Sequence, residues 1–186
     1  GSQIAFIRDG VTQTIGSDLS PALYGILFQH LHTMVATFFG EEGSVKVSES
    51  ATQFMDQAIF IVKSILEQAQ ENTDDLALAN FESLILSFVK YCSQLVLNMD
   101  SVRIKCKLCI LIETLMNKKE YITFKDEIEF RFNCLRHIVD WTSDFALKSE
   151  SAGDSLASSH QSAEFALFRD LDVLCLRAVA ALLKDL

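Results

Sequence analysis

The feature that most constrains the fold of this chain is the scarcity of residues that break helices. Its 186 residues include one proline and seven glycines. Apolar residues recur at intervals of three and four along most of the chain, which is the spacing of an amphipathic helix. The strict alternation of a β-strand is hard to find. The sequence therefore predicts an all-α protein.

The apolar pattern and its interruptions divide the chain into helices joined mostly by short loops. We expect helices at 3–16, from Pro21 to a stop at Gly40, at 50–70, at 80–97, over a stretch containing 103–119, from Thr123 to about 148, and at 163–185. Short loops between long helices predict that neighbours in sequence lie antiparallel.

Several of these expected helices carry capping residues and an apolar face. Ser20 is the expected N-cap of the helix that starts at Pro21. Asp100 or Ser101 is expected to cap the 103–119 segment, and Thr123 with Asp126 resembles a capping box. The expected inward faces are Leu23, Leu27, Leu31, Met34 and Phe38; Phe54, Ala58, Ile61 and Ile65; Phe81, Leu84, Ile85, Phe88, Cys92, Leu95 and Val96; and Phe168, Leu171, Cys175, Ala178 and Leu182.

The stretch "RIKCKLCILIETLMNKK" (103–119) is apolar on two sides of the expected helix. One face holds Ile104, Leu108, Leu111, Ile112 and Leu115, and the other holds Val102, Cys106, Cys109, Ile110 and Met116. A helix that is apolar nearly all round is buried between layers. Stacked antiparallel helical pairs of the HEAT or armadillo kind supply such layers, so we expect a segment of an α-solenoid.

The composition changes at "SESAGDSLASSHQS" (149–162), which is rich in serine and nearly devoid of large apolar residues. We expect a mobile loop at 149–161 within a single helical segment that covers 3–186. Gly1-Ser2 resembles a scar of tag cleavage, and "RAVAALLKDL" stops inside a helical pattern. We therefore expect a fragment of a much larger protein.

The charge and cysteine content exclude several function classes. The net charge is −9, and lysine and arginine form no stripe, which argues against nucleic-acid binding. No apolar run approaches the ~20 residues that span a bilayer. The five cysteines form no loop framework, so a reducing, cytoplasmic setting is the simplest interpretation.

Cys106 and Cys109 form a C-x-x-C, the motif that most resembles a chemical site. A thioredoxin-like site needs a preceding strand, which is missing from this pattern. Cys134 and His137 add an i, i+3 pair, so a Cys3His zinc site is conceivable, but zinc knuckles usually present C-x-x-C from a turn. The favoured interpretation is small buried residues, since a free cysteine packs like a hydrophobe.

The other polar residues predict no catalytic, metal-binding or cofactor-binding site. His30 and His32 point to different sides of a helix, and Ser159-His160 lacks a nucleophile elbow. Glu127 and Arg131 lie four residues apart on the expected helix. Arg131 could bind a partner or act in catalysis, but the favoured interpretation is a semi-buried ion pair with Glu127.

Five blocks of this sequence resemble, in the same order, the neurofibromin family, which includes animal neurofibromin and the fungal Ira proteins. The resemblance runs from Leu19 onward and rests on the number and order of the blocks. They are "LSPALYGILF" (19–28), "TQFMDQAIFIVKSIL" (52–66), "RIKCKLCILIETLM" (103–116), "FKDEIEFRFNCLRHIVDW" (124–141) and "RDLDVLCLRAVAALL" (169–183).

Members of that family are large cytoplasmic GTPase-activating proteins that act as negative regulators of Ras. The resemblance implies a helical segment N-terminal to the GAP-related domain. It also implies partners in the rest of the parent chain, in Ras through the parent's GAP domain, and in a homodimer of the parent that reaches membranes peripherally. The closest strings to the family's GAP signature, "CLRHIVD" and "CLRAVAA", lack its proline. The segment is therefore expected not to be an enzyme, and no catalytic residue carries over.

Three function classes remain open at this stage. The first is a non-catalytic scaffold that supports the architecture and assembly of the parent protein. The second is an armadillo-type peptide-binding module, although Trp141 is the single tryptophan and forms no ladder of the kind such grooves show. The third is a metal-binding domain built on the cysteines.

Overall fold

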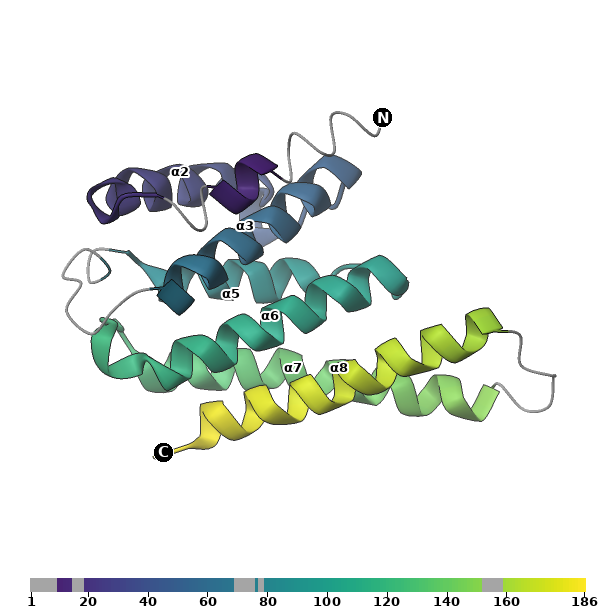
Figure 1. Ribbon diagram of the computed structural model, residues 1–186. Helices are drawn as coiled ribbons and strands as arrows, with labels where there is room; N and C mark the ends of the chain where they lie inside the picture. The colour runs from purple at the N-terminus through teal and green to yellow at the C-terminus, as the bar shows by residue number, and fades with distance from the viewer. Residues whose placement is uncertain (1–9, 15–18, 69–75, 77–78, 152–158) are drawn as a thin grey trace.

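The computed structural model describes the backbone of residues 10–14, 19–68, 76, 79–151 and 159–186, with side chains except at 143–151 and 159–164. The prediction of an all-α fold is confirmed over this part of the chain (Figure 1). Its elements are η1 (Pro21–Leu23), α2 (Tyr24–Thr37), η2 (Glu41–Gly43), α3 (Glu49–Gln68), α5 (Phe81–Cys92), α6 (Met99–Asn117), η3 (Lys119–Tyr121), α7 (Glu127–Ser151) and α8 (Ser159–Leu183).

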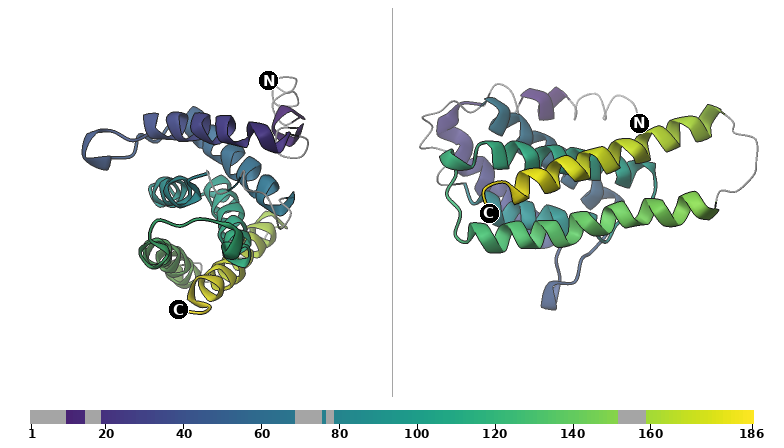
Figure 2. Two further views of the ribbon diagram at one scale, coloured as in Figure 1. Left: turned by 90° about the vertical axis from the view of Figure 1, so that its left-hand side faces the viewer. Right: turned by 90° about the horizontal axis from the view of Figure 1, so that it is seen from below.

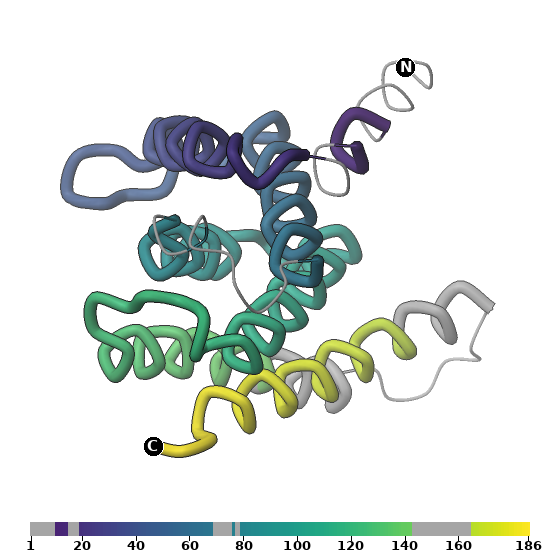
Figure 3. The backbone as a smooth tube through the Cα atoms, turned by 60° about the vertical axis from the view of Figure 1, so that its left-hand side comes forward, coloured from purple at the N-terminus to yellow at the C-terminus, as the bar shows by residue number. Residues whose placement is uncertain are grey.

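The helices form three layers, with α2 and α3 at the top of Figure 1, α5 and α6 in the middle, and α7 and α8 at the bottom. Contacts between layers run along two columns. On one side α2 contacts α5 and α5 contacts α7; on the other α3 contacts α6 and α6 contacts α8 (Figure 3). The middle layer is therefore covered from both sides by helices.

The centre of the core is α6, as its two apolar faces predict. Leu108, Leu111, Ile112 and Leu115 are fully buried, and so are Val102 and Cys109 of the second face. Of the ten residues predicted for the two faces, only Ile110 is half-buried rather than buried. Because α3, α5 and α8 all contact α6, few of its side chains reach water.

Side chains from neighbouring helices hold several helix ends. Lys118 donates from Nζ to the carbonyls of Leu66 and Glu67 at the end of α3. The Glu82 carboxylate accepts from the backbone N–H of Lys125 at 2.7 Å, just before α7. The last carbonyls and first N–H groups of a helix lack partners within it. These bonds satisfy some of those groups and tie successive layers together.

The predicted inward face of α2 is confirmed in part: Leu31 is buried, and Leu27 and Phe38 are half-buried against the core. Leu23 and Met34 are exposed, and the buried residues are Tyr24, Phe28, Leu31 and Val35. Phe28 packs edge-on against Phe81 at 4.8 Å between ring centroids. Two adjacent apolar stripes compete here, and the contact of Phe28 with Phe81 of α5 turns the stripe of Tyr24, Phe28 and Val35 toward the core.

The start of α2 also differs from the prediction. Ser20 and Pro21 begin a 3₁₀ turn, and Ser20 makes no side-chain capping bond. The helix ends at Thr37, three residues before Gly40, which was the predicted end. Of the expected helix at 3–16, residues 10–14 are helical and the remainder lies outside the described residues.

α5 ends five residues earlier than predicted, and an extended residue separates it from α6. α5 ends at Cys92, so Leu95 and Val96 leave the helix, and Val96 is 80% exposed. The N-cap of α6 is Asn98, which forms a capping box with Ser101; Asp100 is not the cap. Asn98 is extended (φ −149°, ψ 174°), so the chain has to leave helical geometry before it.

The two C-terminal helices are shifted from their predicted positions: α7 begins and ends about three or four residues later, and α8 begins four residues earlier. Asp126 alone caps α7, accepting from the Glu129 N–H at 2.9 Å, and Thr123 takes no part. The backbone is helical to Ser151 and again from Ser159, so the predicted loop at 149–161 is too wide at both ends. Its remaining part, 152–158, lies outside the described residues.

Candidate functional site

The C-x-x-C lies in the middle of α6 rather than at a turn. Cys106 and Cys109 are buried, and the Cys109 Sγ atom lies 3.7 Å from the Sγ atom of Cys175 on α8. Burial raises the pKa of Cys106 to about 11 and that of Cys92 on α5 to about 12. These thiols are protonated at neutral pH, whereas nucleophiles and metal ligands are thiolates. The burial agrees with their interpretation as packing residues.

The four side chains of the conceivable zinc site do not converge. Cys134 is fully buried in α7, and burial raises its thiol pKa. His137 Nδ1 lies 2.9 Å from the Ser93 hydroxyl, which also accepts from Trp141 Nε1 at 3.3 Å. Within the described residues no group of three or more His, Cys, Asp and Glu side chains is placed to hold a metal ion.

The histidines and the serine considered as catalytic candidates lie apart from one another or outside the described side chains. His30 is exposed on α2, whereas His32 is half-buried, and burial lowers the pKa of its imidazole. Ser159 and His160 begin α8 rather than lying in a loop, and their side chains lie outside the described residues. The structure brings none of these residues together into a catalytic arrangement.

Arg131 is the most deeply buried charged side chain of the described residues, with 1% of its surface exposed. Its guanidinium pairs with Glu127, as the i, i+4 spacing predicts. It also donates to the carbonyls of Leu182 and Lys184 at the end of α8, at 3.0 and 2.8 Å. The arginine therefore caps α8 and fastens it to α7.

The buried thiols predict a loss of stability at alkaline pH. Below the unfolded-state thiol pKa of about 9, both states keep the proton. Between pH 9 and about 12 the unfolded chain loses the Cys92 proton while the folded protein keeps it, so unfolding becomes easier. Each such thiol contributes a slope of about −1.4 kcal/mol per pH unit to the free energy of unfolding. Cys92→Ala should reduce the wild-type slope by that amount, measured by urea unfolding in reductant at pH 8–10.5.

The matched control for this measurement is Val89→Ala, which removes buried methyl groups from the same helix and no thiol. It should lower the free energy of unfolding at every pH without changing the slope. An unchanged slope in Cys92→Ala would contradict the assignment of a raised thiol pKa to this position.

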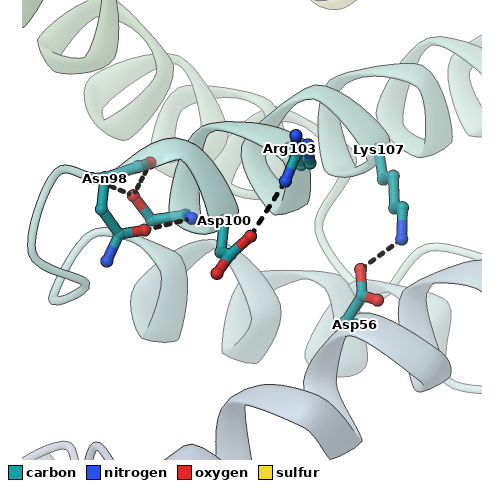
Figure 4. A network of polar contacts seen from close by, with 6 residues as sticks. Asp56, Asn98, Asp100, Arg103 and Lys107 are labelled. Carbon is teal, nitrogen blue, oxygen red and sulfur yellow. Dashed lines mark hydrogen bonds and ion pairs between the residues drawn. The ribbon is translucent and has the colours of Figure 1, made fainter. Parts of the chain in front are cut away.

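A groove of about 480 Å³ lies between the N-terminal halves of α3 and α6. Lys107 of α6 crosses it to Asp56 of α3, with 2.6 Å between Nζ and Oδ1, and Arg103 pairs with Asp100 at 3.1 Å (Figure 4). Four of the five charged residues in the lining are thus paired with one another, and Glu49 accepts a hydrogen bond from Gln53. The apolar part of the lining includes Val47, Leu95, Val96 and Ile104.

The exposed large apolar side chains of the long described helices are confined to three of them. None lies on α3, α5 or α6, whereas the outer helices α2, α7 and α8 carry several. On these helices they are Ile26 and Met34; Ile128, Phe132 and Val139; and Phe165, Val173, Leu176 and Leu183. Exposed apolar residues at helical spacing mark a face that packs against another element.

The apolar residues of α7 lie on its side toward α8. Arg131 reaches the α8 carbonyls, and Ile128 and Leu135, at i−3 and i+4, share its side of the helix. Phe132 and Val139 continue this stripe, and both are more than half exposed.

On α8 the exposed residues Leu176 and Leu183 lie on one side of the helix, beside Val179. Arg177 pairs with Glu113 of α6, and Val179 lies on the opposite flank of the helix. Leu176 and Leu183 lie at i−3 and i+4 from Val179. The two helices run side by side along the lower face of the molecule (Figure 2, right). We call this surface the α7–α8 seam: Ile128, Phe132, Leu135, Val139, Leu176, Val179 and Leu183.

No protein-family model matches the chain. None of the described helices combines the length and apolar character that crossing a bilayer requires.

The sequence interpretation missed the seam although a signal for it was present. Ile128, Phe132, Leu135 and Val139 repeat at i, i+4, i+7 and i+11, beside the buried stripe of the same helix. The contact of Cys109 with Cys175 had no such signal, because the two residues are 66 positions apart.

Proposed function

We propose that this chain is a non-catalytic scaffold segment of a Ras GTPase-activating protein of the neurofibromin and fungal Ira type. The ordered sequence blocks between Leu19 and Leu183 support that assignment. The layered helices support a HEAT- or armadillo-like solenoid of antiparallel pairs in a cytoplasmic parent protein.

The observation that carries the scaffold role is the confinement of exposed apolar faces to the outer layers. α6 buries two faces because helices cover it on both sides, whereas α2 and the α7–α8 seam each leave one apolar face uncovered. In a solenoid each layer is covered by the next. The uncovered faces therefore suit further helical layers of the parent, which this segment would hold in place relative to the GAP domain.

A peptide-binding module is the second candidate, and the groove between α3 and α6 favours it. The pairs Asp56–Lys107 and Asp100–Arg103 already neutralise both basic side chains of the lining, which leaves Glu49 as its one charged residue outside an ion pair. A peptide would have to displace those pairs or bind through the apolar rim, so the groove supports this candidate less strongly than the outer faces support a scaffold.

The isolated chain should not accelerate GTP hydrolysis by Ras. An arginine finger contributes about 10³–10⁵ in rate and requires an arginine presented to the transferring phosphate. In the described part of the chain Arg103, Arg131 and Arg177 are held in ion pairs, and Arg136 and Arg169 lie on helices. A single-turnover assay should return the intrinsic rate, with a known GAP domain as the positive control.

The scaffold role is tested by a seam variant, which is measured both in the isolated chain and in the full-length parent. Phe132→Asp together with Leu176→Asp should leave the helicity and Tm of the isolated chain nearly unchanged, since both side chains are exposed. In the parent the pair should lower abundance or assembly. The matched control, Arg136→Asp, changes an exposed residue outside the seam. Acceleration by the isolated chain, or a parent unaffected by the seam variant, would contradict the proposal.

A further inference from the structure

Cys109 and Cys175 form a contact between two thiols across the interface of α6 and α8. Their Sγ atoms lie 3.7 Å apart, and neither residue has any exposed surface. Both are free thiols in this structure, so the contact is an S–H···S hydrogen bond. Cys134, by contrast, is equally buried on α7 and has no sulfur contact within hydrogen-bond distance among the described residues.

We propose that Cys109 and Cys175 are a redox-modification site, whose oxidation by a hydroperoxide forms a disulfide that fastens α8 to α6. A disulfide holds its sulfur atoms about 2.05 Å apart. The two sulfur atoms must therefore approach by roughly 1.7 Å from their present separation of 3.7 Å. This proposal rests on the thiol contact and does not depend on the proposed scaffold function.

The oxidation proceeds in two balanced steps. When α8 opens and water reaches the pair, one cysteine loses its proton, and its thiolate attacks the O–O bond of the hydroperoxide; this gives a sulfenic acid, and the oxygen that leaves takes up the proton as water or an alcohol. The second thiol attacks the sulfenic sulfur atom, which forms the S–S bond and expels water. Two thiols lose two electrons and two protons, and the hydroperoxide accepts both. A thiol without a close partner, such as Cys134, would stop at the sulfenic acid or proceed to higher acids.

Access to the pair is controlled by α8. Both sulfur atoms are covered in the closed structure, so an oxidant reaches them only when α8 moves away from α6. α8 is an outer helix, and its principal contacts are with α6 and α7. Its contact with α6 is the most extensive between any two of the described helices, so this opening is infrequent and the oxidation slow. The rate of oxidation should therefore follow the opening of α8, and the disulfide should then prevent that opening.

Cys106 is the competing thiol, because it lies one turn from Cys109 and is 8% exposed. Its slight exposure makes it the thiol of α6 that an oxidant meets first. The geometry nevertheless favours the Cys109–Cys175 pair, whose sulfur atoms are already in hydrogen-bond contact. The identity of the linked residues is thus the decisive observation.

The test is peptide mapping by mass spectrometry, without reduction, after exposure of the purified chain to hydrogen peroxide. We expect one intramolecular disulfide between Cys109 and Cys175 and a rise in Tm of about 5–10 °C, reversed by dithiothreitol. Cys134→Ala and Cys106→Ala should form the same disulfide, whereas Cys175→Ala should not.

Three outcomes would overturn the proposal. They are a disulfide that includes Cys106, conversion of Cys109 or Cys175 to sulfinic acid without a disulfide, and thiols that remain unmodified under conditions that oxidise the exposed methionine Met34. The map of the wild-type chain decides among these outcomes by itself, so the conclusion does not depend on whether any variant folds.

Discussion

The substitution Leu108→Asp should leave the chain unfolded at 25 °C. Leu108 is fully buried in α6, which lies between the outer layers of helices. Burying an unpaired carboxylate costs several kcal/mol, and the loss of the leucine side chain adds about 2–5 kcal/mol. Domains are typically stable by about 5–15 kcal/mol. Far-ultraviolet circular dichroism should show loss of helix, and urea titration should show no folded baseline.

The matched control places the same charge on an outer layer. Ile128→Asp changes an α7 residue that is 60% exposed, and its effect on the free energy of unfolding should stay within about 0.5 kcal/mol. If both variants were equally destabilised, the assignment of α6 to the centre of the core would be wrong.

The substitution Arg131→Ala should destabilise the chain by about 2–4 kcal/mol. It leaves the carbonyls of Leu182 and Lys184 without a buried donor and removes the partner of Glu127. Breaking a buried pair typically costs about 3–5 kcal/mol. Glu127 keeps 38% of its side-chain surface exposed, so water compensates part of that loss. Urea unfolding, with hydrogen exchange to locate the change at the end of α8, measures the effect.

Two further variants separate the role of the guanidinium from that of charge alone. Arg136→Ala removes an exposed arginine from the same helix and should cost no more than about 0.5 kcal/mol. Arg131→Lys keeps the charge, but a single ammonium lacks the planar fork of donors, so we expect an intermediate loss. Equal stabilities for Arg131→Ala and Arg136→Ala would show that the cap on α8 contributes nothing.

Some local features of the fold were predicted correctly from spacing within one helix. The two apolar faces of 103–119 predicted a helix buried on both sides, and α6 is such a helix. The i, i+4 spacing of Glu127 and Arg131 predicted their ion pair. Where two signals competed, as in the adjacent stripes of α2, the sequence did not decide which one faces the core. Burial there depends on what the opposite helix presents, and Phe81 of α5 selects the stripe with Phe28.

The sequence by itself determined that this protein is helical, that α6 is central, and that its cysteines are small apolar residues on helices. Those properties follow from spacing within one helix, which is a local matter. Only the tertiary structure decided that Arg131 caps α8 and that Cys109 meets Cys175. Each of these contacts joins positions more than 35 residues apart, and their meeting is set by how whole helices stack.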